Sequence, residues 1–181
     1  MRLLDRVLQR WRVRKALPWV RAGDRLLDVG CFDRTLLKQV EARVESAIGV
    51  DPLVEPAHEE KISLWRGTFP ADDRFDPESF DCLTILAVFE HVEEPAAFAR
   101  ACHRVLAPGG RVILTVPHPF VDRILDVLMF VGLADGMAAE EHHGFDVEET
   151  APIFKAAGFR LREVVAFQLG LNRLFVFEKA A

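Results

Sequence analysis

The stretch LLDVGCFDRTLL, residues 26–37, decides the fold of this chain. Three of its first four residues are apolar, which is typical of a short buried β-strand. Gly30 then marks a turn, because a glycine lets the backbone approach a neighbouring group closely. Asp33 is a residue type that caps the start of a helix, and apolar residues follow it. A strand, a glycine turn and a helix are the first unit of a sheet whose strands alternate with helices.

The remainder of the chain continues this alternation. Helices are predicted over 33–43, 95–106, 121–131 and 147–157, with only a single turn or a truncated helix between 51 and 60. The residues 169–172 form a short link that predicts an antiparallel hairpin at the C-terminal end. We therefore expect an α/β fold, with a doubly wound, mostly parallel seven-stranded sheet. Its strands are predicted at 25–29, 47–50, 61–66, 80–88, 111–116, 160–168 and 173–178.

Composition excludes several classes of protein. The 181 residues are 50% hydrophobic and 28% charged, which fits a globular chain of about one domain. No apolar stretch reaches the roughly 20 residues that cross a bilayer. The three cysteines form no CxxC pair, so we expect reduced thiols and a cytoplasmic protein. The histidine pair at 142–143 has no third ligand at a suitable spacing, so no metal site is expected.

The N-terminal segment differs in charge from the rest. Residues 1–21 carry seven arginines and lysines against one aspartate, a net charge of +6. Because the whole chain carries −5, the remaining residues carry −11, which argues against nucleic-acid binding. We expect an amphipathic helix within 1–20 and one domain over 21–181, with a lid insertion at about 117–158. The helix either covers a ligand or contacts an anionic membrane surface through residues 2–19.

Four segments should meet where the parallel strands end. They are residues 28–33, 50–52, 67–69 and 87–91, and ligands of such sheets bind beyond the carboxyl ends of the strands. Asp51 closes a strand there, and its carboxylate can accept two hydrogen bonds from a ribose diol. These segments predict a nucleotide-like ligand at this edge.

The chain resembles the class I S-adenosylmethionine-dependent methyltransferases in four stretches, in the order and at the spacing of that family: LLDVGCFDRTLL (26–37), GVDP (49–52), residues 80–91 and RVLAPGGRVILTVP (104–117). The likeness is to small bacterial enzymes that methylate quinones and other small molecules. It covers about 25–117 closely, and the C-terminal hairpin agrees with it. The resemblance implies a Rossmann-like methyltransferase fold, S-adenosylmethionine as cofactor, and methyl transfer to a small-molecule acceptor.

The resemblance also assigns cofactor contacts, residue by residue. It places Asp28 and Gly30 at the methionine end, Asp51 at the ribose, Pro52, Thr68 and Phe69 at the adenine, and Ala87 and Val88 along the methionine pocket.

Two residues depart from the family's Asp-x-Gly-x-Gly-x-Gly loop. Phe32 and Arg34 replace the second and third glycines. Phe32 either lies along the cofactor or blocks it, and Arg34 either binds the methionine carboxylate or points into solvent. An alternative function follows from them: a catalytically inactive, methyltransferase-like binding or partner subunit. A nicotinamide-dependent reductase is disfavoured, because the chain has no GxGxxG and no tyrosine.

The sequence signals for the methyl acceptor are less specific than those for the cofactor. Methyl transfer mainly needs alignment, and a base is required only for a hydroxyl or a protonated amine. The candidate bases are His118, His91 and His143. Residues 117–146 are rich in apolar side chains, which predicts either a lid that packs on the domain or a site for an apolar, lipid-like acceptor.

Overall fold

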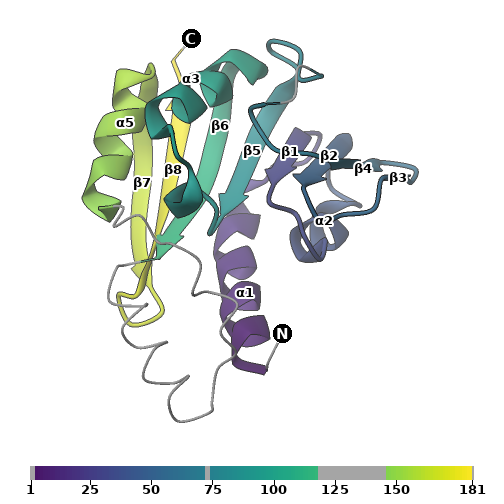
Figure 1. Ribbon diagram of the computed structural model, residues 1–181, viewed down its shortest axis with the longest axis horizontal. Helices are drawn as coiled ribbons and strands as arrows, with labels where there is room; N and C mark the ends of the chain where they lie inside the picture. Colours follow the sequence, from purple (N-terminus) through teal and green to yellow (C-terminus); the bar gives the residue numbers. More distant parts are fainter. Residues whose placement is uncertain (1–2, 72–73, 118–145, 181) are drawn as a thin grey trace.

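The computed structural model describes residues 3–71, 74–117 and 146–180. Its centre is one mixed sheet of eight strands in the order β3-β4-β2-β1-β5-β6-β8-β7 (Figure 1). The five strands β4, β2, β1, β5 and β6 are parallel to one another. β3 runs antiparallel to β4, and β8 runs antiparallel to both β6 and β7. The strands are β1 (Arg25–Val29), β2 (Ser46–Asp51), β3 (Ala57–His58), β4 (Ile62–Arg66), β5 (Phe80–Leu86), β6 (Leu106–Pro117), β7 (Phe159–Phe167) and β8 (Asn172–Lys179).

Helices cover both faces of this sheet. α1 (Leu3–Ala16) and α2 (Thr35–Val40) pack on one face, and α3 (Pro95–Val105) and α5 (Thr150–Ala156) pack on the other (Figure 1). Three short 3-10 turns are also present, at Leu17–Trp19, Phe89–His91 and Val147–Glu149. The expected doubly wound fold is therefore confirmed, and so is the C-terminal hairpin. The helix predicted over 121–131 lies outside the described residues.

The strand sequences explain the two cores. Neighbouring side chains of a strand point to opposite faces, so Leu27 and Leu83 join the cluster beneath α3 and α5. Leu26 and Cys82 join the cluster beneath α1 and α2. β1 and β5 are buried on both faces, which is why apolar residues occupy neighbouring positions in them and do not alternate with polar ones.

The expectation of seven strands was wrong by one. Residues between β2 and β4 were expected to form a helical turn, but β3 lies there and pairs antiparallel with β4, Ala57 opposite Leu64. The link is too short for a crossover helix, so it returns as a hairpin whose backbone groups are satisfied by β4. α2 also begins and ends at Thr35 and Val40, inside the predicted 33–43.

α1 runs lengthwise along the sheet, from the carboxyl ends of the parallel strands toward their amino ends. Near its start, Gln168 of the β7–β8 turn donates from Nε2 to the carbonyl oxygen of Leu8 at 2.9 Å. Just beyond its end, buried Arg111 of β6 donates to the carbonyl oxygen of Trp19 and pairs with Asp24. α1 therefore begins at the edge where the parallel strands end. Among the helices the structure describes, none is long and apolar enough to cross a membrane.

Candidate functional site

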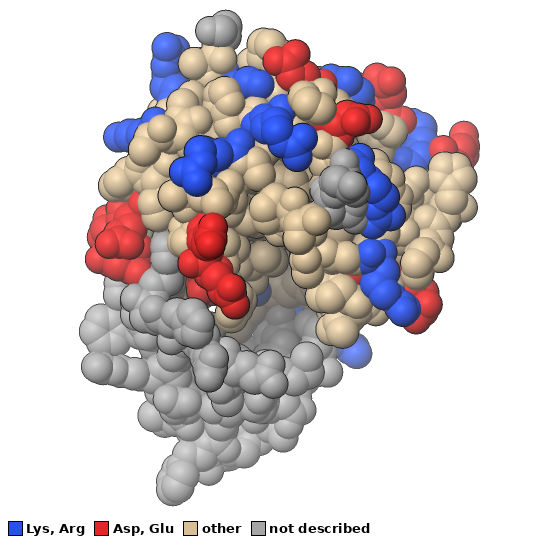
Figure 2. All heavy atoms as spheres, turned by 45° about the horizontal axis from the view of Figure 1, so that its top comes forward, with Lys and Arg blue, Asp and Glu red and all other residues tan. Residues whose placement is uncertain are grey.

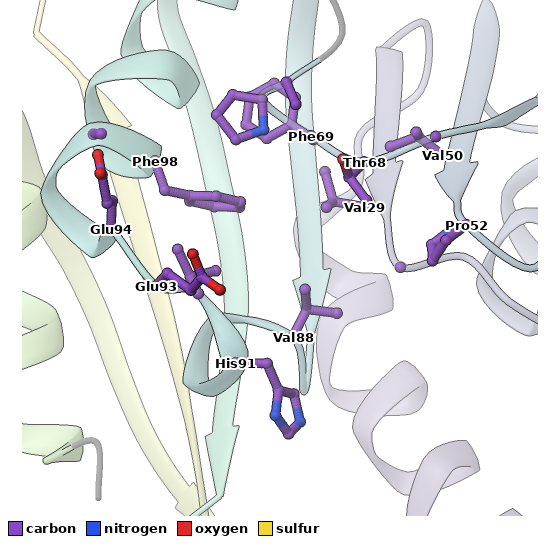
Figure 3. A pocket seen from close by; sticks show the side chains of 16 residues that line it. Val29, Val50, Pro52, Thr68, Phe69, Val88, His91, Glu93, Glu94 and Phe98 are labelled. Atoms are coloured by element: carbon purple, nitrogen blue, oxygen red, sulfur yellow. The ribbon is translucent and has the colours of Figure 1, made fainter. Parts of the chain in front are cut away.

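A cavity of about 630 Å³ opens at the carboxyl ends of β1, β2, β4 and β5. Figure 2 shows this hollow in the space-filling view, with acidic side chains beside it. The volume is in the range of pockets that hold nucleotides and other small molecules. Its lining comes from the strand ends and from the start of α3 (Figure 3): Val29, Gly30, Val50, Pro52, Gly67, Thr68, Phe69, Pro70, Ala71, Val88, His91, Val92, Glu93, Glu94, Ala97 and Phe98.

The loop after β1 forms one wall, and its backbone is unusual. Gly30, Phe32 and Arg34 have φ angles of 78°, 24° and 65°, all in the left-handed region that favours glycine. At position 30 a side chain has no room, because an added Cβ would lie 2.3 Å from Cγ2 of Val88. The loop therefore keeps the form of a glycine-rich turn although two of the three residues carry side chains.

Side chains from three other segments hold this loop. The backbone N–H of Phe32 donates to Oδ2 of Asp51 at 3.2 Å. Gln9 of α1 donates from Nε2 to Oδ1 of Asp33 at 3.0 Å. Arg34 pairs with Glu59, next to β3, at 2.6 Å. These contacts stabilise a backbone conformation that would otherwise cost on the order of 1–3 kcal/mol at each non-glycine residue.

Asp51 is the carboxylate at the end of β2 and is buried. Its Oδ2 accepts the Phe32 N–H, and its Oδ1 accepts the N–H of Leu53 at 2.8 Å. An ionised carboxylate has about four acceptor sites, so these two bonds leave acceptor capacity for a diol. Pro52 follows directly and lines the cavity.

Asp28 lies in β1, behind the cavity lining, and is fully buried. Thr84 of β5 donates from Oγ1 to Oδ1 of Asp28 at 2.6 Å. The pKa of Asp28 is raised to about 7. Burial is the main cause and the nearby carboxylates of Asp33 and Asp51 add to it, while the Thr84 hydrogen bond lowers the pKa. Asp28 therefore changes its charge near neutral pH.

This raised pKa predicts a pH dependence of stability. The folded state binds the proton of Asp28 more tightly than the unfolded state, so the free energy of unfolding should fall as the pH rises from about 4 to 7. A difference of about three pKa units corresponds to on the order of 4 kcal/mol. In denaturant titrations, Asp28→Asn should become more stable relative to the parent chain as the pH rises over this window.

Asp81 supplies the control for this pH dependence. Its pKa is lowered by the hydrogen bond and ion pair with Arg25, so Asp81→Asn should lose stability relative to the parent as the pH rises through the acidic range. If the stability difference between Asp28→Asn and the parent does not change between pH 4 and 7, the pKa of Asp28 is not raised in the folded state.

Aromatic rings form the deep wall of the cavity. Phe69 packs edge-on against Phe98 of α3, with ring centroids 5.2 Å apart, and against Phe75 at 5.3 Å. In Figure 3 the Phe98 side chain points from α3 toward Phe69 and Val29. Val88, at the end of the β5 segment, faces this wall (Figure 3). The cavity thus offers an apolar slot beside these rings.

His91 lies at the cavity beside Val88, on the 3-10 turn after β5 (Figure 3). Its ring is half exposed, and Nε2 is 4.0 Å from Oε1 of the buried Glu90. Before this turn, Ala87 has φ 58°, and its N–H donates to Oγ1 of Thr115 at 3.1 Å. The Ala87 backbone therefore turns the chain sharply from β5 toward His91. His118 and His143 lie outside the described residues.

The residues singled out in the sequence fall into two groups. Gly30, Pro52, Thr68, Phe69, Val88 and His91 line the cavity, whereas Asp28, Phe32, Arg34, Asp51 and Ala87 support the loops around it. Arg34 pairs with Glu59, and its contact with the methionine carboxylate stays a prediction.

Sequence reasoning missed the part of the cavity that belongs to α3. Glu93 and Glu94 line it just before the helix, and Phe98 lines it one turn inside. The apolar spacing along 98–105 is typical of a helix face buried in the core, and it does not indicate that the first turn faces a cavity. The signal that could have found it is Glu-Glu-Pro directly after the predicted site segment 87–91.

Known proteins resemble this chain in both sequence and fold. A curated ubiquinone biosynthesis O-methyltransferase from Pseudomonas syringae pv. tomato is 37% identical over 103 residues, which are 52% of this chain and 44% of that protein. The corresponding protein of Pseudomonas aeruginosa is 36% identical over the same length. The match thus spans less than half the length of these curated relatives.

Solved structures share the fold at low sequence identity. One chain in the complex of the Haloferax volcanii Trm112 methyltransferase activator with a methyltransferase has a TM-score of 0.75 at 17% identity, over 94% of this chain and 90% of that one. The 1,6-didemethyltoxoflavin-N1-methyltransferase of Burkholderia thailandensis, solved with S-adenosylhomocysteine, has a TM-score of 0.71 at 17% identity, over 95% of this chain and 78% of that one.

The family assignment rests on most of the chain. A family model described as a methyltransferase domain matches residues 2–164, from α1 into β7. The resemblance to class I methyltransferases is confirmed, with S-adenosylmethionine as the cofactor of the class. The chain belongs to this family of S-adenosylmethionine-dependent methyltransferases.

Proposed function

We propose that this protein transfers a methyl group from S-adenosylmethionine to a small, apolar acceptor with a hydroxyl group. The observation that carries the proposal is the cavity at the carboxyl ends of the strands, in which a glycine turn, a strand-end aspartate and an apolar slot come together. A methyltransferase needs one site for the cofactor and an open approach to its methyl group.

The residues present fit the cofactor. Asp51 keeps acceptor capacity for the ribose hydroxyls, and Gly30 allows the backbone to approach the ligand. Pro52, Phe69 and Phe98 offer apolar surface for the adenine. Carboxylates around the site favour the cationic sulfonium and ammonium groups. When bound, S-adenosylmethionine supplies an activated methyl group on its sulfonium.

Two observations support an apolar acceptor. The described lining is dominated by aliphatic and aromatic side chains, and residues 117–146, which follow β6, are rich in apolar residues. The names of the curated relatives point to an acceptor from ubiquinone biosynthesis. We therefore propose a hydroxylated aromatic ring with an apolar substituent as the acceptor, and residues 117–146 as the lid over it. The C-terminal part of the expected 117–158 insertion is not part of this lid, because Thr150–Ala156 forms α5, which packs on the sheet.

His91 is the proposed base. A hydroxyl acceptor must lose its proton as the methyl transfers, and the His91 ring lies at the cavity with Glu90 behind it. His118 and His143 remain further proposals for the same role. α1 is proposed to cover the cofactor, because Gln9 binds the loop through Asp33.

Calorimetry and product formation together test the function. The purified protein should bind S-adenosylhomocysteine and S-adenosylmethionine at one site, and should methylate a catechol with an apolar substituent, detected by mass spectrometry. Binding without any product across a panel of hydroxylated acceptors would favour the inactive, methyltransferase-like subunit. Absence of binding would refute both the cofactor site and the enzyme.

Phe32→Gly tests whether Phe32 blocks the cofactor. Its side chain is 45% exposed and is not part of the cavity lining. Removing an exposed side chain changes free energies little, so we expect the affinity for S-adenosylhomocysteine to stay within about twofold. A tightening of tenfold or more would contradict this and would identify Phe32 as a plug.

His91→Asn tests the proposed base. Removing a general base costs on the order of 100-fold or more in turnover, while the affinity for S-adenosylhomocysteine should stay within about twofold. His103→Asn is the matched control, because His103 packs on Phe159, away from the cavity lining. Equal turnover of the His91 variant and the parent would exclude His91 as the base.

A further inference from the structure

α1 has two faces with different surroundings. Val13 and Ala16 are buried in the core beneath the helix, and Gln9 binds Asp33. The opposite side exposes five residues, which we call the basic-aromatic face: Arg6, Val7, Arg10, Trp11 and Arg14. At 3.6 residues per turn, these positions form one continuous stripe along the helix.

The arginines of this face differ from six arginines elsewhere in the described residues, which form ion pairs. In the parts of the chain described, none of Arg6, Arg10 and Arg14 forms an ion pair with a carboxylate. They are spaced four residues apart, so their like charges repel along the helix and destabilise it. By contrast, arginines elsewhere are paired with acidic residues: Arg25, Arg34, Arg66, Arg111, Arg162 and Arg173.

Apolar side chains accompany these charges. Val7 is 49% exposed and Trp11 is 42% exposed, although both are large hydrophobic residues. Leu169, which is 97% exposed, follows the Gln168 that binds the carbonyl oxygen of Leu8. An exposed leucine at the hairpin tip therefore lies beside the start of the helix. Indole rings prefer the boundary between water and lipid. The arginines and the exposed apolar side chains together therefore suit a surface whose outer layer is anionic and whose interior is apolar.

We propose that the basic-aromatic face binds the surface of an anionic lipid bilayer, with α1 lying in the plane of the headgroups. The remaining chain carries a charge of −11, which repels a long polyanion that would wrap around the protein. A flat surface contacts only the basic-aromatic face. α1 touches the cofactor loop through Gln9, so docking places the cavity near the bilayer. Membrane binding by this face does not depend on the proposed function. Only the further step, that membrane binding serves a lipid-like acceptor, rests on it.

Vesicle co-sedimentation of the full chain tests the proposal. The protein should sediment with vesicles of phosphatidylglycerol and phosphatidylcholine, and not with phosphatidylcholine alone. A basic residue near an anionic surface contributes about fivefold in affinity, so the triple variant Arg6→Glu, Arg10→Glu, Arg14→Glu should bind on the order of 100-fold more weakly. The charge-conserving triple Arg→Lys variant should still bind.

A matched control separates this face from net charge. Arg100→Glu, Lys155→Glu and Arg160→Glu together make the same change in net charge, on exposed residues of α3, α5 and β7. This variant should keep most of the binding. An equal loss in both triple variants would overturn the proposal, as would equal binding to vesicles without phosphatidylglycerol.

Two further measurements keep the outcome clear. Trp11→Ala changes one exposed side chain and should weaken binding severalfold, even if the charge-reversed helix fails to fold. Calorimetry with S-adenosylhomocysteine on the same samples reports folding and the cofactor site separately, because sedimentation needs neither cofactor nor acceptor. Cofactor binding with no sedimentation refutes the membrane proposal alone. Binding of a single-stranded RNA in place of vesicles would also overturn it.

Discussion

Asp51→Asn is expected to weaken S-adenosylhomocysteine binding by on the order of 100-fold, because hydrogen bonds to a charged group are each worth about 1.5–3 kcal/mol. The Asp51 carboxylate accepts the N–H groups of Phe32 and Leu53, one on each oxygen. An asparagine would turn an NH2 group toward one of these donors. The variant therefore loses both the site for the ribose diol and one support of the loop after β1.

Calorimetry checks this expectation against Asp81→Asn. Asp81 is a carboxylate at the opposite end of the sheet, where it pairs with Arg25, so its loss should leave cofactor affinity within about twofold. Unchanged affinity in Asp51→Asn would place the cofactor elsewhere. Equal weakening in both variants would indicate a general loss of folding, which thermal unfolding would detect.

Gly30→Ala should remove cofactor binding and destabilise the fold by about 3 kcal/mol, from left-handed backbone strain and overpacking together. The φ of 78° is unfavourable for alanine, and the new Cβ would lie 2.3 Å from Cγ2 of Val88. Val88 lines the cavity, so its displacement changes the site directly. Denaturant unfolding and calorimetry measure the two effects.

Gly23→Ala is the matched control for this variant. Gly23 has φ 81°, but an added Cβ would meet nothing within 4 Å. It should therefore cost only the backbone strain, about 1–2 kcal/mol, and leave cofactor affinity unchanged. If the two variants lose the same stability and bind equally well, the contact with Val88 has no part in the site.

The sheet could be predicted because its signals are local. Leu26, Leu27 and their neighbours form apolar runs whose length and flanking turns specify buried strands. β3 escaped prediction because two residues carry no periodicity, and only pairing with β4 defines them. The positions of Gly30 and Asp51 at strand ends could also be predicted from local signals, because each residue stands at the end of a strand-like stretch.

The supports of the site could not be predicted, because they join distant residues. Gln9 and Asp33 are 24 positions apart, and their contact depends on how α1 packs on the sheet. Arg34 faces Glu59 only because β3 folds back beside β4. Neither pair leaves a periodic pattern in the sequence. Phe98 has a recognisable apolar spacing, but that pattern is the same for a core residue and for a cavity wall.

The left-handed backbone at Phe32 and Arg34 has a consequence for how such loops diversify. Bonds from Asp51, Gln9 and Glu59 impose the shape of the turn from outside, so glycine is one route to this shape among several. Once such supports exist, substitutions at the second and third glycine positions become tolerable, and the loop gains side chains that can vary between descendants. A descendant that lost Asp51 would again need glycine at positions 32 and 34 to keep the shape of the turn.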